Sequence, residues 1–190
     1  MEDAIIYIVD DDKALCHVLS KIIEGLGLKT VTCNSAEELL EAIPLNEVGC
    51  ILLDIRMGGL SGMELQQVLI QKDCQLPIIF LTGHGTVRMA VQAVQLGAYD
   101  FLEKPFDNDR LVKLVQSAVE QSRKRNIDKH KLDILTTAEH EIFDALVKGM
   151  TNKEIALEKG LSIRTVEFHR SNIKEKTNST TLADLIRLVD

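Results

Sequence analysis

The first two-thirds of the chain repeat one pattern, in which a short apolar run is followed by a stretch with helical spacing. The apolar runs predict strands at 4–9, 28–33, 49–53, 77–81 and 98–102. The stretches that follow predict helices at 12–24, 36–43, 62–71, 86–96 and from about 108 onward. Because strand and helix alternate five times, the pattern predicts a five-stranded, doubly wound parallel α/β sheet with helices on both faces.

Polar residues and glycines mark the ends of these helices. Ser35 and Glu38 have the spacing of a capping box for the second helix. Gly25 and Gly97 follow the first and fourth helices, where they are expected to stop them. Asp107 or Asn108 caps the fifth helix.

The remainder of the chain contains helical patterns and no strand pattern. Residues 120–133 are polar, charged and free of proline, which favours a helical connector over a flexible linker. Four helices are then expected, capped at Thr136 or Thr137, Thr151, Ser162, and Thr180 or Thr181. The second and third meet at "KGLS", a compact turn with the character of a helix-turn-helix.

Composition narrows the class of protein. At 190 residues, with 45% hydrophobic residues and no tryptophan, the chain can form one large or two small domains with aliphatic cores. It has no membrane-length apolar run and an acidic start, so we expect a soluble, cytoplasmic protein with no membrane partner. The four cysteines form no CxxC pair, which argues against zinc or dithiol chemistry. The net charge of −7 is uneven, since residues 151–177 hold six basic against four acidic residues.

Polar side chains gather where the predicted strands end. The carboxyl ends of parallel strands meet at one edge of the sheet, where such folds bind ligands. The residues at these ends are Asp10, Asp11 and Asp12 after the first strand, Asp54 after the third, Thr82 after the fourth and Lys104 after the fifth. Taken alone, the three consecutive aspartates fit a solvated loop or a helix N-cap as well as they fit a functional site.

Together these groups suit phosphoryl transfer. Two or three carboxylates at one point favour Mg²⁺, which also offsets their repulsion. Asp54 then has an oxygen that can attack phosphorus and form an aspartyl phosphate. Lys104 supplies a positive charge and Thr82 a hydroxyl to the phosphoryl oxygens.

The set Asp10–Asp11, Asp54, Thr82 and Lys104-Pro105 resembles the receiver domain of two-component response regulators. The runs "IYIVDDD", "TGHGTVRMAV" and "GAYDFLEKPF" are similar to those of the FixJ branch of the NarL/FixJ family. The resemblance implies a flavodoxin/CheY-like fold and a phosphate passed to Asp54 from a sensor histidine kinase. It also implies a protein that is no classical enzyme, although such a regulator would slowly remove its own phosphate.

The same resemblance assigns roles to individual residues. Mg²⁺ would be held by Asp11, Asp54 and the backbone carbonyl of Arg56, with Asp10 acting mostly through water. Asp12 would cap the first helix, and Lys104-Pro105 would be a cis peptide. The further roles implied are a switch at Thr82 and Phe101, and control of the phosphate lifetime at Arg56 and His84. His84 fits a solvated loop position as well.

One position departs from the family pattern. The loop after Asp54 reads "RMGGLSG", with Gly58 where the family usually has proline. Glycine leaves the unfolded loop less restrained. We expect an effect on loop order and cation affinity, and none on the core chemistry.

The segment "LTTAEHEIFDALVKGMTNKEIALEKGLSIRTVEFHRSNIKEKT" resembles the LuxR-type helix-turn-helix of NarL/FixJ regulators, whereas its weak charge alone would fit a protein-binding bundle. Ala138 stands where the family usually has arginine.

In the helix after Ser162, the residues expected to be buried are Ile163, Val166 and Ile173. The residues expected to contact DNA are Glu167, Phe168 and Ser171 at base edges, Lys153, Thr165, Arg170 and Lys174 at phosphates, and Arg164 on the same exposed face. Phe168 could instead belong to the core.

These inferences predict a receiver at 1–122, a helical linker at 123–133 and a four-helix DNA-binding domain at 134–190. The expected function is a Mg²⁺-assisted, phosphorylation-controlled transcriptional regulator. Its expected partners are a histidine kinase, double-stranded DNA with paired half-sites, a second copy of the chain when phosphorylated, and RNA polymerase. One alternative is a Mg²⁺-dependent phosphatase with an aspartyl nucleophile. Such enzymes have a second acid two residues after the nucleophile, and here that position is Arg56, which argues against this function. The other alternative is a LuxR-type regulator that senses a small molecule.

Overall fold

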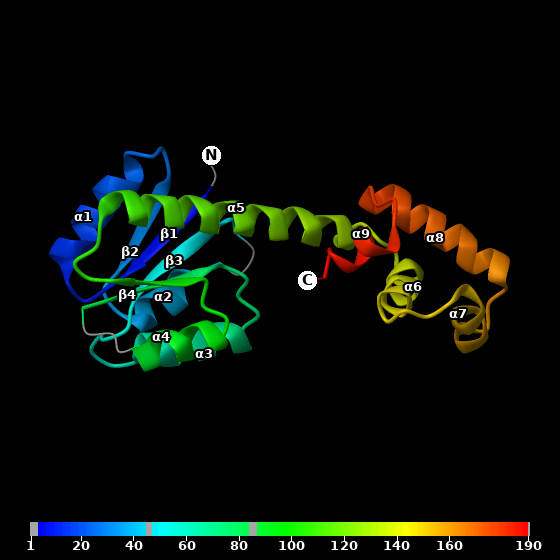
Figure 1. Ribbon diagram of the computed structural model, residues 1–190, viewed down its shortest axis with the longest axis horizontal. Helices are drawn as coiled ribbons and strands as arrows, with labels where there is room; N and C mark the ends of the chain where they lie inside the picture. Colours follow the sequence, from blue (N-terminus) through cyan, green and yellow to red (C-terminus); the bar gives the residue numbers. More distant parts are fainter. Residues whose placement is uncertain (1–3, 45–46, 84–86, 190) are drawn as a thin grey trace. The chain divides into compact units, whose positions relative to one another are not determined.

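The computed structural model describes residues 4–44, 47–83 and 87–189 (Figure 1). The chain divides into two compact units, Met1–Lys124 and Arg125–Asp190. Within the described residues, no helix combines the length and the apolar character needed to cross a bilayer.

The first unit contains a five-stranded parallel sheet, which confirms the predicted fold class. Its strands are β1 (Ile5–Val9), β2 (Lys29–Cys33), β3 (Gly49–Asp54), β4 (Ile78–Thr82) and β5 (Asp100–Glu103). Their order across the sheet is β2-β1-β3-β4-β5, and every neighbouring pair is parallel. After β1 the chain adds β2 on one side of that strand and β3, β4 and β5 on the other, so the carboxyl ends of β1 and β3 flank the topological switch point.

Helices cover both faces of the sheet (Figure 1). They are α1 (Lys13–Glu24), α2 (Ala36–Ala42), α3 (Gly62–Gln71), α4 (Val87–Gln95) and α5 (Asn108–Asp133). On one face, α1 and α5 pack against alternate strand residues such as Ile8 and Leu52. On the other, α2, α3 and α4 pack against the intervening residues, such as Val9 and Leu53. The central strands are apolar on both faces because both faces are buried.

Two local predictions for the first unit need correction. Ser35 accepts a hydrogen bond from the Glu38 amide, but Glu38 accepts from the backbone and side chain of Asn34, so the reciprocal half of the capping box is missing. The fifth strand begins at Asp100 instead of 98. The reason is that the Ala98 amide donates to the Ala93 carbonyl and so completes the end of α4.

The fifth helix continues through the connector to Asp133 and is capped by Asp107, whose carboxylate accepts from the amides of Asp109 and Arg110. The second unit then contains α6 (Thr137–Val147), α7 (Asn152–Lys159), α8 (Ile163–Thr177) and α9 (Leu182–Ile186). Capping boxes at Thr136, Thr151 and Thr181 begin three of these helices.

A small apolar core holds the second unit together. Phe143 of α6, Ile155 of α7 and Ile173 of α8 are its central members, and each is almost fully buried. Gly160, at φ +65°, lets the chain turn sharply between α7 and α8. The expectation that Ile163 is buried is wrong, because this first residue of α8 lies one turn before the core residue Val166 and is 41% exposed.

Candidate functional site

Three carboxylates meet at the carboxyl edge of the sheet. Asp10 follows β1 and Asp54 ends β3, and both side chains are buried, whereas Asp11 is exposed. One carboxylate oxygen from each lies within 4.8 Å of the others. All the donors are hard oxygens, which is the ligand type that Mg²⁺ prefers, so the donor set fits this cation.

The third consecutive aspartate has a different environment. The Asp12 carboxylate accepts hydrogen bonds from the amides of Ala14 and Leu15, at 2.9 and 3.1 Å, and so caps α1. Asp10 in turn accepts from the Asp12 amide at 2.9 Å. The local backbone therefore orients two of the three acids in different directions.

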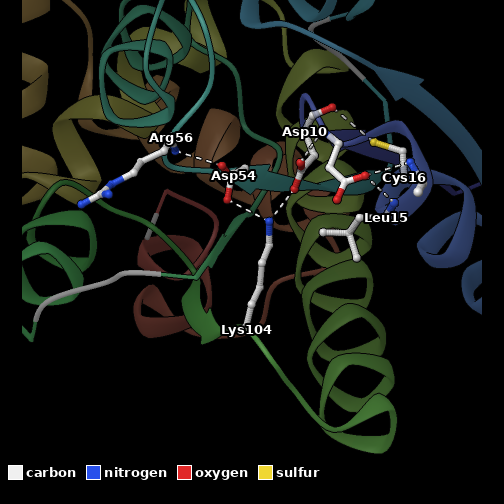
Figure 2. Close-up of polar contacts among 8 residues, drawn as sticks. Asp10, Leu15, Cys16, Asp54, Arg56 and Lys104 are labelled. Carbon is white, nitrogen blue, oxygen red and sulfur yellow. Dashed lines mark hydrogen bonds and ion pairs between the residues drawn. The ribbon is translucent and has the colours of Figure 1, made fainter.

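Lys104 reaches the two buried acids from the end of β5. Its Nζ lies 2.6 Å from Asp10 Oδ2 and 3.0 Å from Asp54 Oδ1, so that the ammonium is placed between the carboxylates (Figure 2). Burial lowers the pKa of Lys104, but its hydrogen bonds to Asp10 and Asp54 outweigh burial and hold that pKa above its ordinary value. The Lys104-Pro105 peptide is cis.

The Asp54 carboxylate is held at both oxygens. Besides Lys104 at Oδ1, the backbone amide of Arg56 donates to Oδ2 at 3.0 Å. Burial raises the pKa of Asp54, and the hydrogen bond from Lys104 opposes this change. The Arg56 side chain itself points away from the carboxylates (Figure 2).

The two residues of the expected switch lie on adjacent strands. Thr82 ends β4 and is buried, and its backbone carbonyl accepts a hydrogen bond of 2.7 Å from the Lys104 amide. Phe101 is half-buried in β5, in register with Phe80. His84 lies outside the described residues.

Two residues that the sequence analysis left without a role also support the site. The Cys16 thiol in α1 donates to the Asp10 carbonyl at 3.4 Å (Figure 2). Gly62 packs so closely on β3 that an added Cβ would lie 2.2 Å from the Asp54 carbonyl oxygen. Neither contact has a local sequence signal, because both depend on how the elements pack.

The exposed face of α8 carries all three side chains expected to read bases. Glu167, Phe168 and Ser171 are exposed, as is Arg164 one turn earlier. Phe168 is 62% exposed, which rules out its placement in the core. Val166 and Ile173 occupy the opposite, buried face.

The residues expected at phosphates differ in their freedom. Lys153 is exposed at the start of α7, and Thr165 is partly buried, where its amide donates to the Ser162 hydroxyl. Arg170 donates to the Asn152 side chain, and Lys174 donates to the Thr180 carbonyl at 2.8 Å. Arg170 and Lys174 therefore have partners within the unit before any ligand arrives.

Comparisons with known proteins match both units. Residues 6–116 match the family described as the response regulator receiver domain. Residues 133–189 match the family described as bacterial regulatory proteins, luxR family.

Individual relatives align over nearly the whole chain. The transcriptional regulatory protein FixJ of Bradyrhizobium diazoefficiens is 36% identical, with 96% of this chain and 93% of the relative covered. The response regulator protein TmoT of Ectopseudomonas mendocina is 35% identical, with 100% and 89% covered.

Solved structures give the same picture. The response regulator StyR has a TM-score of 0.63 and 33% identity, with 98% of both chains covered. Full-length FixJ from B. japonicum has a TM-score of 0.60 and 35% identity, with 100% of this chain and 97% of that chain covered.

Proposed function

Since the chain belongs to the response regulators that join a receiver to a LuxR-type DNA-binding domain, we propose that phosphorylation of Asp54 controls its binding to DNA. The observation that carries this proposal is the shared contact of Lys104 with Asp10 and Asp54. This contact places the Lys104 ammonium, which can bind phosphoryl oxygens, beside the Asp54 carboxylate. That carboxylate is buried and lies next to two further acids, Asp10 and Asp11.

The proposed donor is a phosphohistidine of a sensor kinase. An Asp54 carboxylate oxygen attacks the phosphorus, the bond from phosphorus to the histidine nitrogen breaks, and the imidazole leaves with a proton. Lys104, whose Nζ lies 3.0 Å from Asp54 Oδ1, and the Thr82 hydroxyl would stabilise the phosphoryl oxygens. The backbone amide of Arg56 keeps the attacking carboxylate in place. Arg56 and His84 would tune the lifetime of the phosphate.

Mg²⁺ would be held by Asp10, Asp11 and Asp54, together with the backbone carbonyl of Arg56. When bound, the cation would neutralise charge on the acids and on the incoming phosphoryl group. Asp11, as the exposed member of the set, can take up a cation without a prior change in the core.

At the other unit, we propose that α8 is the recognition helix in the major groove of DNA. Glu167 can accept a hydrogen bond from a cytosine amino group, and Phe168 can contact a thymine methyl group. Arg164 and Ser171 extend the same exposed face, while Lys153, Thr165, Arg170 and Lys174 are the proposed phosphate contacts. Phosphorylation would favour a homodimer that places two recognition helices on paired half-sites. RNA polymerase is the proposed downstream partner.

Incubation with acetyl phosphate and Mg²⁺, followed by intact-protein mass and light scattering, tests this proposal. We expect the mass of one phosphoryl group on the wild-type chain, its absence in Asp54→Asn, and a larger particle only in the phosphorylated sample. Release of phosphate from added phosphomonoesters with turnover would instead favour a phosphatase. Small-molecule-dependent DNA binding by Asp54→Ala would favour a ligand-sensing regulator.

A further inference from the structure

Gln66 is a polar residue in the core of the first unit. It lies in the second turn of α3 and is 1% exposed. Its Nε2 donates to two backbone carbonyl oxygens, Ala93 O and Leu96 O, each at 3.2 Å. A primary amide has two N–H donors, so both are used, and the two carbonyl partners fix which way the amide faces.

The carbonyls that Gln66 binds belong to the end of α4. A helix leaves its last carbonyls without partners inside the helix. Gly97, at φ +89°, ends this helix, and the Ala98 amide returns to Ala93 O at 2.9 Å. Gln66 therefore adds a second donor to Ala93 O and supplies one to Leu96 O, which ties the α4–β5 turn to α3.

Packing alone does not account for a glutamine at this position. Its Oε1 is buried and has no hydrogen-bond partner among the described residues. A buried acceptor of this kind is unfavourable, whereas methionine or leucine would fill a similar volume without one. What glutamine offers over these residues is its pair of donors.

The first residue of α3 lies against Asp54, the proposed phosphoacceptor. Gly62, the first residue of α3, is one turn before Gln66 and is packed against the Asp54 carbonyl oxygen. The α4–β5 turn leads directly into β5, which carries Phe101 and ends before Lys104. The helix α3 thus contacts the end of β3 through its first residue, Gly62, and contacts the α4–β5 turn one helical turn later, through Gln66.

We propose that Gln66 is a positioning residue that clamps the α4–β5 turn to α3, so that a shift at Asp54 is passed through α3 to that turn. The clamp itself exists in the resting protein, and its part in transmission rests on the proposed phosphorylation of Asp54. The neighbouring Gln67 is exposed on the same helix and provides a matched control.

Hydrogen–deuterium exchange of the full chain tests the clamp, with Gln66→Met as the variant and Gln67→Met as the control. In the resting protein we expect the amides of Gly97 and Ala98 to exchange about ten-fold faster in Gln66→Met, the scale for losing one or two hydrogen bonds. Gln67→Met should match the wild type. Should Gln66→Met fail to fold, Gln66→Leu removes the same donors with a smaller side chain.

The same proteins, treated with acetyl phosphate and Mg²⁺, test transmission. We expect equal initial rates and equal Mg²⁺ dependence of phosphorylation in all three. The phosphorylation-induced change in exchange at 93–98 should occur in the wild type and Gln67→Met and be lost in Gln66→Met. Unchanged exchange at 93–98 in resting Gln66→Met, or an equal increase throughout the receiver, would overturn the clamp.

A wild-type response to phosphorylation that persists in Gln66→Met would overturn transmission. If the wild-type chain gains no phosphoryl mass at all, the proposed function fails and transmission fails with it. The exchange rates of the resting proteins still decide the clamp in that case.

Discussion

The ammonium of Lys176 lies 2.7 Å from the carboxylate of Glu139, and this ion pair joins the last turn of α8 to the first turn of α6. Glu139 is only 3% exposed, and the same carboxylate accepts a hydrogen bond of 2.8 Å from the Thr136 amide. The hydrogen bonds from Lys176 and from Thr136 lower the pKa of Glu139 to about 2.

Glu139→Gln should destabilise the second unit, because it replaces a buried, charge-assisted pair with a neutral contact. We expect a loss of about 1–3 kcal/mol in the free energy of unfolding at neutral pH. A carboxylate whose pKa is lower in the folded than in the unfolded chain stabilises above its unfolded pKa, and this contribution disappears as the pH falls through its folded pKa. Wild-type stability should therefore fall more steeply than that of Glu139→Gln between about pH 5 and pH 2.

Urea unfolding followed by circular dichroism over this pH range measures both effects. Glu154→Gln is a matched control, since Glu154 forms a similar capping box with Thr151 but is exposed, and the structure describes no lysine bound to it. A smaller loss is expected there. Equal losses in the two variants would mean that capping, and not the ion pair with Lys176, is what matters at Glu139.

A second prediction concerns the cation shared by Asp10 and Asp54. Lys104→Met leaves two buried carboxylates without it, which should cost about 3 kcal/mol of stability in the absence of divalent cations, the low end of the range for such pairs. The low end applies because the Lys104 side chain is still 22% exposed. Mg²⁺ should raise the Tm of Lys104→Met by more than it raises that of the wild type, because it replaces the counter-charge that Lys104 supplied.

Thermal unfolding with EDTA and with Mg²⁺ provides this comparison. Lys72→Met removes an exposed lysine and should leave both Tm values unchanged. The cation site would have to be placed elsewhere if Mg²⁺ shifted the Tm of Lys104→Met no more than that of the wild type.

A third prediction contrasts two glycines that follow Asp54, Gly58 in the loop and Gly62 at the start of α3. Gly62→Ala would place a Cβ 2.2 Å from the Asp54 carbonyl oxygen, and we expect it to cost about 1–3 kcal/mol through overpacking and to slow phosphorylation. At Gly58, an added Cβ meets nothing within 4 Å and the backbone φ is not positive. Gly58→Ala should therefore be neutral or stabilise by up to about 1 kcal/mol, because it restrains the unfolded chain.

Chemical denaturation and the initial rate of phosphorylation by acetyl phosphate measure these effects. The two substitutions add the same methyl group four residues apart, so each serves as the control for the other. Similar stability for both variants would show that the backbone at Gly62 relaxes easily, and that α3 is less firmly set against β3 than its packing indicates.

The parts of this molecule that follow from local sequence were predictable. The sheet follows from alternating apolar and helical segments, and caps at Thr151 and Ser162 follow from their spacing to the next helix. The meeting of Asp10, Asp54 and Lys104 follows from the rule that parallel strands share a carboxyl edge.

Features that depend on tertiary packing were not predictable. Glu38 has the spacing of a capping box, but its carboxylate accepts hydrogen bonds from the backbone amide and side chain of Asn34 instead. Ile163 has core-like spacing to Val166, but the core does not extend as far as the first residue of α8. Nothing in the local sequence distinguishes Gln66 from Gln67, although one is buried and the other is exposed.

The last prediction concerns base reading by α8. Because Phe168 is 62% exposed and outside the core, Phe168→Ala should leave the stability of the second unit nearly unchanged. If its ring contacts a thymine methyl group in each half-site, the affinity for the selected site should fall by up to about the 1–3 kcal/mol per half-site that one mismatched base pair costs. The loss should be confined to specific sequences, since an apolar ring adds nothing to phosphate binding.

Selection of DNA sites from a random pool, followed by fluorescence anisotropy with the selected site and with a scrambled duplex, measures this. Leu157→Ala is the control, since Leu157 is 87% exposed on α7 and is assigned no DNA contact. Lys153→Ala should instead weaken binding to both duplexes and reduce the dependence of affinity on salt. If Phe168→Ala weakened both duplexes equally, the ring would not be reading bases, and the exposed face of α8 would have to enter the groove in another orientation.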